Sequence, residues 1–300
     1  MNLKREIEKL REWKNAVILA HNYQITEIQE VADFVGDSLE LARMATKTKT
    51  DIIVFCGVDF MAETASVLNP DKKVLIPTRE ARCPMAAQLP AEMVKKVKEE
   101  NPDVPFVIYV NSLAEAKAEA DICCTSANAA KVVESLKSDK VFLGPDANLA
   151  WFAAQKTGKE VIPVPSDGYC YVHKKFSKED VLRVRKDHPD AVVIVHPECN
   201  PDVQLAADYV GSTSQMVKFA RESEAEKIVV GTEVGLVELM KREIPDKTFI
   251  PPRVSVCEEM KMHTLERLRD ALKYEREVVK VPEEIAERAL KAVKRMLEVS

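Results

Sequence analysis

The fold of this chain is decided by a stretch that occurs three times, as IPTREARC (residues 76–83), VPSDGYC (164–170) and PPRVSVC (251–257). Each copy runs from a short apolar, proline-containing segment to a cysteine. Cys83, Cys170 and Cys257 are each 87 residues from the next. A fixed spacing of this kind predicts that the sequence between the cysteines repeats as well.

Other landmarks recur between the cysteines in the same order. A glycine that follows an apolar run and is itself followed by an acid two residues later occurs in GVD (57–59), GPD (144–146) and GTE (231–233). An Ala-Asp pair opens ADFVGDS (32–38), ADICCTS (120–126) and ADYVGST (207–213). Three apolar runs end in His21, Asn111 and His196. This recurrence indicates three similar units.

Apolar runs in each unit alternate with segments of helical periodicity. In the first unit the pattern predicts strands at 16–20, 33–35, 51–55 and 73–76, and helices at about 25–32, 38–48 and 59–68. Continuous apolar strands between helices are typical of a parallel sheet that is covered on both faces. We therefore expect an α/β fold of three α/β/α sandwich units with short parallel sheets: 1–88, 89–175, and 176–300 with a C-terminal helix.

Ligands bind at the carboxyl ends of strands in open parallel sheets. The recurring polar residues and the three cysteines all come just after such ends. If the three units turn these edges toward one axis, equivalent residues meet around it. We therefore expect a pseudo-threefold, triangular arrangement around a central cavity.

Composition excludes several classes of function. The 300-residue chain is 46% apolar with a net charge of −5, and its basic residues are scattered, so we expect no nucleic-acid partner. No apolar run reaches the roughly 20 residues that cross a bilayer, so we expect no membrane association. Seven cysteines without a disulfide-type pattern favour a reducing, cytoplasmic location. The phosphate-loop, dinucleotide, serine-hydrolase and HExxH motifs are absent.

The three spaced cysteines form a candidate metal site. Three converging thiolates suit zinc or an iron–sulfur cluster, and a four-iron cluster with three cysteines keeps one iron open for substrate. The alternative is that all three cysteines are buried core residues. Four more cysteines lie outside the repeat and are expected to be core residues: Cys56, Cys123, Cys124 and Cys199.

Three hydroxyl residues, Ser38, Ser126 and Thr213, stand at the predicted starts of helices. One interpretation is that each is a helix N-cap. Another is that the three helix N-termini form sites for anionic groups of a substrate. Both roles are compatible.

Histidine, tyrosine and glutamate residues cluster after the strands. His21, Asn111 and His196 are candidates for substrate contact, and Tyr23, Tyr109 and Glu198 lie beside them in HNY, YVN and HPE. A carboxylate and a phenol near a Lewis acid can transfer protons. Ordinary packing is the alternative for each. His173, three residues after Cys170, is a weaker candidate for the same site.

Together these motifs resemble the iron–sulfur quinolinate synthase family, from His21 to Leu265. The resemblance rests on HNY (21–23), GDS (36–38), YVNS (109–112), DGYCYVH (167–173), HPEC (196–199), ADYVGST (207–213), GTEVGLV (231–237) and CEEMKMHTL (257–265). It implies three α/β domains around a [4Fe-4S] cluster held by Cys83, Cys170 and Cys257. It also implies that the enzyme condenses iminoaspartate with dihydroxyacetone phosphate to give quinolinate, phosphate and water, in NAD biosynthesis.

The resemblance also implies roles for the other residues. Substrate would be bound by His21, Ser38, Tyr109, Asn111, Ser126, His196, Glu198 and Thr213, with Tyr23, Glu198 and His21 in the proton transfers. Some members of the family carry the third cysteine in a CxxCxxC run, which here reads Cys257, Met260 and His263, so a disulfide switch is not expected. An aspartate oxidase or dehydrogenase would supply the iminoaspartate.

Two other functions fit parts of the pattern. One is that of hydroxymethylbutenyl diphosphate reductase, which resembles the expected architecture of three units around a cluster. That enzyme consumes electrons, whereas quinolinate formation needs none. A non-catalytic iron–sulfur or zinc sensor would need only the metal site.

Overall fold

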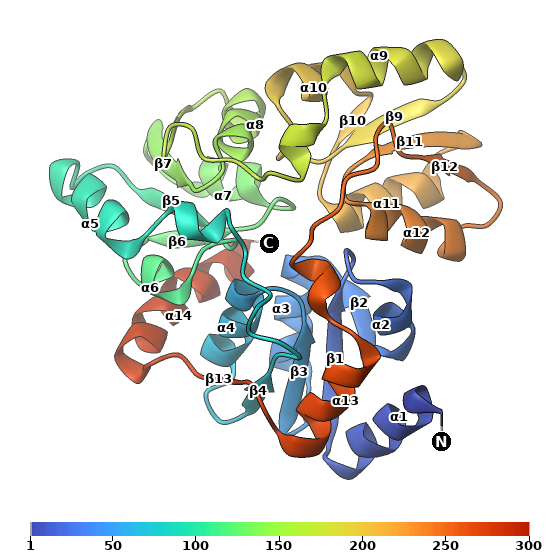
Figure 1. Ribbon diagram of the computed structural model, residues 1–300. Helices are drawn as coiled ribbons and strands as arrows, with labels where there is room; N and C mark the ends of the chain where they lie inside the picture. The colour runs from blue at the N-terminus through green and yellow to red at the C-terminus, as the bar shows by residue number, and fades with distance from the viewer. Residues whose placement is uncertain (1, 300) are drawn as a thin grey trace.

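The computed structural model describes residues 2–299, and its strands form three separate sheets (Figure 1). The first sheet has the strand order β13-β4-β3-β1-β2. Its members are β1 (Ala16–His21), β2 (Phe34–Gly36), β3 (Ile52–Cys56), β4 (Lys73–Leu75) and β13 (Val278–Val279). The helices of this part are α1 (Leu3–Trp13), α2 (Thr26–Val31), α3 (Ser38–Lys47) and α4 (Asp59–Leu68). The predicted strands and helices are all present, with ends that differ by at most one residue.

The second sheet has the order β6-β5-β7-β8, and the third has the order β10-β9-β11-β12. The second part contains α5 (Ala91–Glu100), β5 (Phe106–Tyr109), α6 (Ala114–Lys117), β6 (Ile122–Cys124), α7 (Ala129–Ser135), β7 (Lys140–Gly144), α8 (Ala147–Thr157) and β8 (Glu160–Pro163). The third contains α9 (Lys178–Asp187), β9 (Val192–Val195), α10 (Pro201–Ala206), β10 (Tyr209–Val210), α11 (Thr213–Glu222), β11 (Lys227–Gly231), α12 (Val234–Glu243) and β12 (Thr248–Ile250).

Every pairing within β1–β4, β5–β8 and β9–β12 is parallel, as the apolar runs predicted. The exception is β13, which the sequence did not indicate and which pairs antiparallel with β4. After the last strand of each set, the chain enters a loop that carries a cysteine and ends in a short 3₁₀ helix. These helices are η1 (Ala86–Gln88), η2 (His173–Lys175) and η3 (Met260–Met262).

The Ala-Asp landmark has the same role in all three sheets. Each aspartate accepts a backbone hydrogen bond from the neighbouring strand at 2.8 Å, and its partners are Ile18 for Asp33, Phe106 for Asp121 and Val193 for Asp208. Each also pairs with a basic residue of the first helix of its part, α1, α5 or α9: Arg11, Lys98 and Arg185. The recurrence in sequence therefore corresponds to a recurrence in structure, because one carboxylate ties the short strand β2, β6 or β10 to its neighbour.

Apolar residues fill both faces of each sheet. One large cluster combines side chains from all three sheets, such as Leu19, Val107 and Ile194. Smaller clusters cover the opposite faces of the first, second and third sheets, around Ile18, Ile108 and Val193 respectively. The shared cluster joins the three sheets into one molecule, since hydrophobic burial is the dominant favourable contribution to folding.

The C-terminal segment returns to the earlier parts of the chain. Helix α13 (Leu265–Tyr274) packs against α1 and β3, and α14 (Glu283–Val299) packs against β6, α6 and α4. Figure 1 shows α13 beside α1 and α14 beside α6. Among residues 2–299 there is no helix with the length and hydropathy of a membrane span.

Candidate active site

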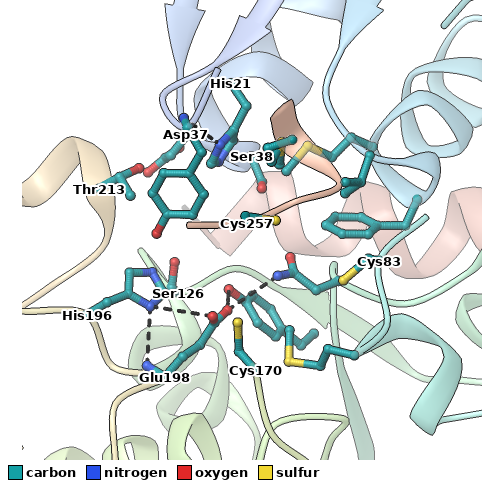
Figure 2. Close-up of a pocket in the computed structure, with 18 of the residues that line it drawn as sticks. His21, Asp37, Ser38, Cys83, Ser126, Cys170, His196, Glu198, Thr213 and Cys257 are labelled. Carbon is teal, nitrogen blue, oxygen red and sulfur yellow. Dashed lines mark hydrogen bonds and ion pairs between the residues drawn. The ribbon is translucent and has the colours of Figure 1, made fainter. Parts of the chain in front are cut away.

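A central cavity brings together the residues that the sequence singled out. The space within it that protein atoms do not fill is about 660 Å³, part of which is open to solvent. Residues from all three parts of the chain line it, and they include every predicted site residue except the weaker candidate His173: His21, Tyr23, Ser38, Cys83, Tyr109, Asn111, Ser126, Cys170, His196, Glu198, Thr213 and Cys257. Figure 2 labels ten residues of this cavity, among them Ser38 and the three spaced cysteines.

His21 and His196 hold the same position at the ends of their strands. His21 is the last residue of β1, and His196 directly follows β9. Each Nδ1 accepts the backbone N–H two residues on, from Tyr23 at 3.1 Å and from Glu198 at 3.2 Å. Because Nδ1 is the acceptor, the ring proton lies on Nε2. Burial lowers the pKa of both imidazoles to about 3, although the Glu198 charge opposes the shift, so both rings are neutral.

These buried histidines predict a loss of stability in acid. Between pH 6.5 and about 3 an imidazole is protonated in the unfolded chain and neutral in the folded protein, so the free energy of unfolding falls as pH falls. The second unit carries Asn111 at the repeat position of His21. Replacing His21 with Asn should therefore remove the part of the acid-dependent stability loss that His21 causes. In denaturant unfolding of the metal-free protein, the wild type should lose about 2 kcal/mol more than the variant between pH 6.5 and pH 5. Equal losses would contradict the expectation.

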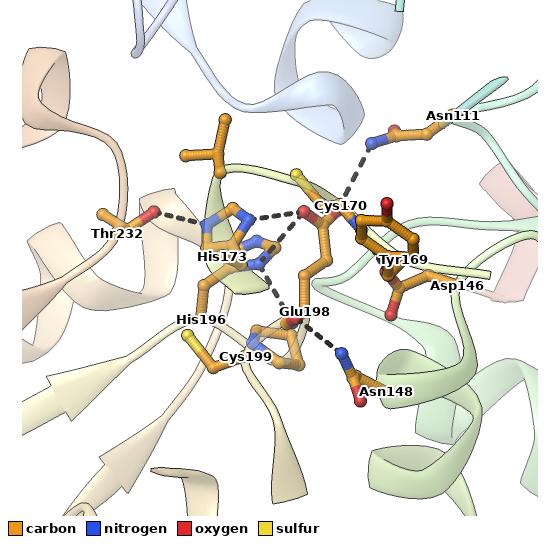
Figure 3. Close-up of polar contacts among 12 residues, drawn as sticks. Asn111, Asp146, Asn148, Tyr169, Cys170, His173, His196, Glu198, Cys199 and Thr232 are labelled. Atoms are coloured by element: carbon orange, nitrogen blue, oxygen red, sulfur yellow. Dashed lines mark hydrogen bonds and ion pairs between the residues drawn. The ribbon is translucent and has the colours of Figure 1, made fainter. Parts of the chain in front are cut away.

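Glu198 is the centre of a buried hydrogen-bond network (Figure 3). Its Oε1 accepts from the Tyr109 hydroxyl at 2.6 Å and from Asn111 Nδ2 at 3.3 Å, and its Oε2 lies 2.7 Å from His173 Nδ1. Burial by itself raises the pKa of Glu198. The two neighbouring histidines, His196 and His173, and the hydrogen bonds outweigh that effect and hold the pKa well below its usual range. Glu198 is therefore an anion inside the cavity.

His173 lies behind Glu198 and does not line the cavity. Its side chain is 1% exposed, its ring stacks on His196 with centroids 4.5 Å apart, and its Nε2 is 2.9 Å from Thr232 Oγ1. The Thr232 hydroxyl is in turn 2.7 Å from the hydroxyl of Tyr23. A continuous path of close polar contacts, each shorter than 3 Å, thus leads from Glu198 through His173 and Thr232 to Tyr23. Thr232, which follows Gly231 in GTE, was not identified from the sequence.

Tyr23 and Tyr109, two of the three tyrosines that line the cavity, are protonated phenols. Burial and then the charge of Glu198 raise the pKa of Tyr23 and of Tyr109 well above the usual value. Each can donate a hydrogen bond or a proton, whereas Glu198 can accept one. The site therefore contains an anionic base and two neutral acids close together.

The N-cap interpretation of the hydroxyl residues is wrong. The caps are the preceding residues Asp37 and Ser212, whose side chains accept the N–H groups of the first turns of α3 and α11. Ser38 and Thr213 are instead the first helical residues. Ser126 lies three residues before α7, so it does not start a helix. Each cap belongs to a capping box, in which the side chain of Glu40 or Gln215 at the third helical position bonds back to the backbone of Asp37 or Ser212.

The N-termini of α3 and α11 therefore lie at the cavity, and each places one hydroxyl there, that of Ser38 or of Thr213. Thr213 Oγ1 accepts from Asn22 Nδ2 at 2.8 Å, which ties the third part of the chain to the first. Asp37, which the sequence analysis did not select, also lines the cavity, and it accepts a hydrogen bond from Ser212 Oγ at 3.0 Å. Its place in the GDS motif, before a helical run, was the available signal.

The three spaced cysteines differ from the others in exposure. Cys83, Cys170 and Cys257 are partly exposed and line the cavity, whereas the other four cysteines are fully buried, as predicted. Around the three thiols the wall is largely apolar, with Met61, Met85 and Met260. Burial raises the pKa of the Cys83 thiol to about 12. Burial is also the main cause of the raised pKa of the Cys170 thiol, and the nearby Glu198, Cys83 and Cys257 add to it. A metal must displace these protons to bind.

Two arrangements could hold metal here. Within residues 2–299, the ligand atoms close enough to hold a single ion belong to Cys170, His173 and Glu198, all within 4.8 Å of one another. His173 Nδ1 and Glu198 Oε2 of this group already contact each other at 2.7 Å. The sulfurs of the three spaced cysteines form no such tight group in the described chain. A four-iron cluster binds each cysteine on a different iron, so wider spacing around an open cavity fits a cluster better than zinc.

Comparison with known proteins identifies the family of the chain. The family described as quinolinate synthetase A protein matches residues 5–298. The chain is 54% identical over 299 residues to a quinolinate synthase of Methanothermobacter thermautotrophicus, covering 99% of this chain and 98% of that protein. It is 52% identical to a quinolinate synthase of Methanocaldococcus jannaschii, covering 100% and 99%, and 54% identical to one of Pyrococcus horikoshii, covering 100% of both. With the family pattern matched almost from end to end, the chain belongs to the quinolinate synthetase A family.

Proposed function

We propose that this protein is a quinolinate synthase, a transferase that condenses iminoaspartate with dihydroxyacetone phosphate, with release of phosphate and water, in NAD biosynthesis. The observation that carries the proposal is the single cavity where three partly exposed cysteines face an anionic glutamate, two neutral histidines and two tyrosines. Relatives named quinolinate synthase cover the whole chain and support it. Iminoaspartate is reached by oxidation of aspartate, so an aspartate oxidase or dehydrogenase would supply it.

The proposed architecture is a pseudo-threefold triangle of three units, 1–88, 89–175 and 176–300. Its support is the common strand order of the three sheets and the matching Asp33, Asp121 and Asp208 contacts. The shared apolar cluster and the cavity lined from all three sheets fit such an arrangement. Helices α13 and α14 would then strap the third unit to the first and second.

Cys83, Cys170 and Cys257 are the proposed ligands of a [4Fe-4S] cluster. When bound through three cysteines, such a cluster supplies one open iron that acts as a Lewis acid toward a substrate oxygen. Each thiol accepts a backbone N–H from the residue three positions later, which favours its deprotonated form. The apolar wall around them limits water at the cluster.

Substrate anions would bind without basic side chains, since the described lining of the cavity contains no lysine or arginine. The N-termini of α3 and α11 offer partial positive charge. Ser38, Ser126 and Thr213 add hydroxyl donors, and Asn111 and the Nε2–H groups of His21 and His196 donate as well. Together they suit the two carboxylates and one phosphate of the substrates.

Proton transfer is assigned to Glu198, Tyr23 and His21. The Glu198 carboxylate takes a proton from the substrate, and the Tyr109 and Asn111 hydrogen bonds orient it. The path through His173 and Thr232 can return a proton to Tyr23, which donates it to a leaving oxygen. His21 Nε2–H faces the same space and polarises a substrate oxygen. Phosphate loss and dehydration both need such donors.

The test is an assay of protein purified and reconstituted without oxygen. We expect quinolinate from iminoaspartate and dihydroxyacetone phosphate with no electron donor, and one phosphate released for each quinolinate. A requirement for a reductant would instead favour a reductive enzyme such as hydroxymethylbutenyl diphosphate reductase. Protein that carries four-iron clusters but makes no quinolinate would overturn the proposed reaction.

A further inference from the structure

The acid of each Gly-x-acid motif contacts the cysteine 24 residues later. The carboxylate accepts the backbone N–H of that cysteine in every unit. The contacts are Asp59 Oδ1 to Cys83 N at 3.0 Å, Asp146 Oδ2 to Cys170 N at 3.2 Å and Glu233 Oε1 to Cys257 N at 3.2 Å. Nothing in the proposed reaction uses these acids, yet the contact recurs three times, so it is not an accident of one loop.

A second contact holds each cysteine from the other side. The thiol sulfur accepts a backbone N–H at the start of the following 3₁₀ helix, with donors Ala86 for Cys83, His173 for Cys170 and Met260 for Cys257. The cysteine is thus restrained at its amide by a carboxylate and at its sulfur by an amide. Together the two contacts limit the directions that the Cβ–Sγ bond can take.

The cysteine loops are pressed closely onto the segments that carry the acids. A Cβ on Gly168, in the loop before Cys170, would lie 1.8 Å from the carbonyl oxygen of Pro145, next to Asp146. The same loop and the acid-bearing helix are joined by a backbone hydrogen bond from Ala147 N to Gly168 O at 2.8 Å. In the third part, Val234 N donates to Ser255 O at 2.9 Å. The loops have no regular structure of their own before the 3₁₀ helices, so these links hold them in place.

We propose that Asp59, Asp146 and Glu233 are positioning residues that aim the three cysteines at the cluster before it is inserted. The inference rests on the proposed ligation by these cysteines. A cluster has fixed iron–sulfur geometry, so a preformed set of thiol directions reduces the ordering needed on binding. Groups that orient metal ligands in this way commonly affect metal affinity although they do not touch the metal.

In the third part of the chain, the acid that contacts the cysteine is a glutamate, and its surroundings explain the longer side chain. Glu233 Oε1 is 2.9 Å from Lys261 Nζ while it also accepts the Cys257 N–H, and Lys261 donates to the carbonyl of Tyr23. A Cβ on Gly235 would lie 2.7 Å from that carbonyl and 2.8 Å from Lys261 Nζ, so only glycine leaves room for this arrangement. The longer side chain therefore joins the Cys257 loop to the strand end that carries His21.

The first test compares Asp59→Ala with Asp202→Ala. Asp202 accepts the N–H of the next residue at 2.9 Å, as Asp59 does, but it has no cysteine contact among the described residues. After anaerobic reconstitution, Asp59→Ala should hold iron about 10- to 100-fold less tightly against a chelator, and Asp202→Ala should match the wild type. Asp59→Asn keeps an acceptor oxygen and should recover most of the affinity. Wild-type retention in Asp59→Ala, or equal loss in Asp202→Ala, would overturn the proposal.

The second test uses metal-free protein, so it is independent of the reaction and of the cluster. Amide hydrogen exchange should speed up in the Cys170 loop of Asp146→Ala and remain unchanged in the Cys83 and Cys257 loops. Ser177→Ala, which removes a side-chain cap from α9, is the matched control for the cap that Asp146 provides to α8. Exchange that is unchanged in Asp146→Ala overturns the positioning role. If wild-type protein fails to bind a cluster but the exchange result holds, the proposed function fails while the contact's role in ordering the loop stands.

Discussion

The Cys170→Ala variant is expected to lose its cluster, and its rate of quinolinate formation should fall by at least about 100-fold. The expected loss is larger than that for residues that only support a metal ligand, because the ligand itself is removed. The loss follows because no other cysteine can replace the ligand. Cys56, Cys123, Cys124 and Cys199 are fully buried and do not line the cavity. Iron and sulfide content, the visible spectrum and quinolinate output would be measured on the same anaerobic sample.

Cys56→Ala is the matched control for this change. Cys56 ends β3 and is fully buried in the cluster of side chains that covers the first sheet, so its removal leaves a small cavity but no missing ligand. We expect it to keep its cluster and most of its activity, with a modest loss of stability. Should Cys170→Ala retain wild-type iron and quinolinate output, the three-cysteine cluster would be wrong.

The second large effect is expected for Glu198→Gln, with kcat reduced by about 10² to 10⁴ and iron content unchanged. The amide cannot accept a proton as a base. It also cannot match the charge-assisted contact with His173 at 2.7 Å, and it offers a weaker acceptor to Tyr109. Single-turnover quinolinate formation on fully loaded protein would separate this defect from slow product release.

Asp180→Asn provides a comparable change away from the cavity. Asp180 is 1% exposed and pairs with Arg253 at 3.0 Å and Arg183 at 2.9 Å. Replacing it also neutralises a buried carboxylate, so the variant should be less stable but keep kcat within a few-fold of the wild type. A Glu198→Gln enzyme with kcat within tenfold of the wild type would remove Glu198 from the proton transfers.

Much of the fold could be predicted because its signals are local and repeated. The apolar runs at 16–20 and 51–55 differ by one residue at an end from β1 and β3. Buried parallel strands need apolar side chains on both faces, so a continuous run marks them without knowledge of their neighbours. Strand β13 was missed because two residues carry too little pattern, and its pairing with β4 depends on the path of the C-terminal segment.

The helix starts show where a local pattern was ambiguous. In GDS and GST, two adjacent residues can cap a helix, and one interpretation placed the cap at Ser38 and Thr213, the second of each pair. Asp37 and Ser212 cap instead, which leaves Ser38 and Thr213 in the first turn facing the cavity. A shift of one residue therefore changes a structural role into a candidate ligand contact.

The sequence by itself determined the three-unit repeat, the parallel sheets and the set of residues that come to line one cavity, because a period of 87 residues is visible without any contact being known. Only the tertiary structure decided which side chains meet. Glu198 follows β9 in the third part of the chain, whereas Tyr109 and His173, which contact its carboxylate, belong to the second part, and the path from His173 reaches Tyr23 in the first. The acids that hold the cysteine loops lie 24 residues from their partners. The contacts of Glu198 and Tyr23 depend on how distant parts of the chain pack, and the acid–cysteine contacts depend on how each cysteine loop folds back within its own part, so no local propensity encodes either.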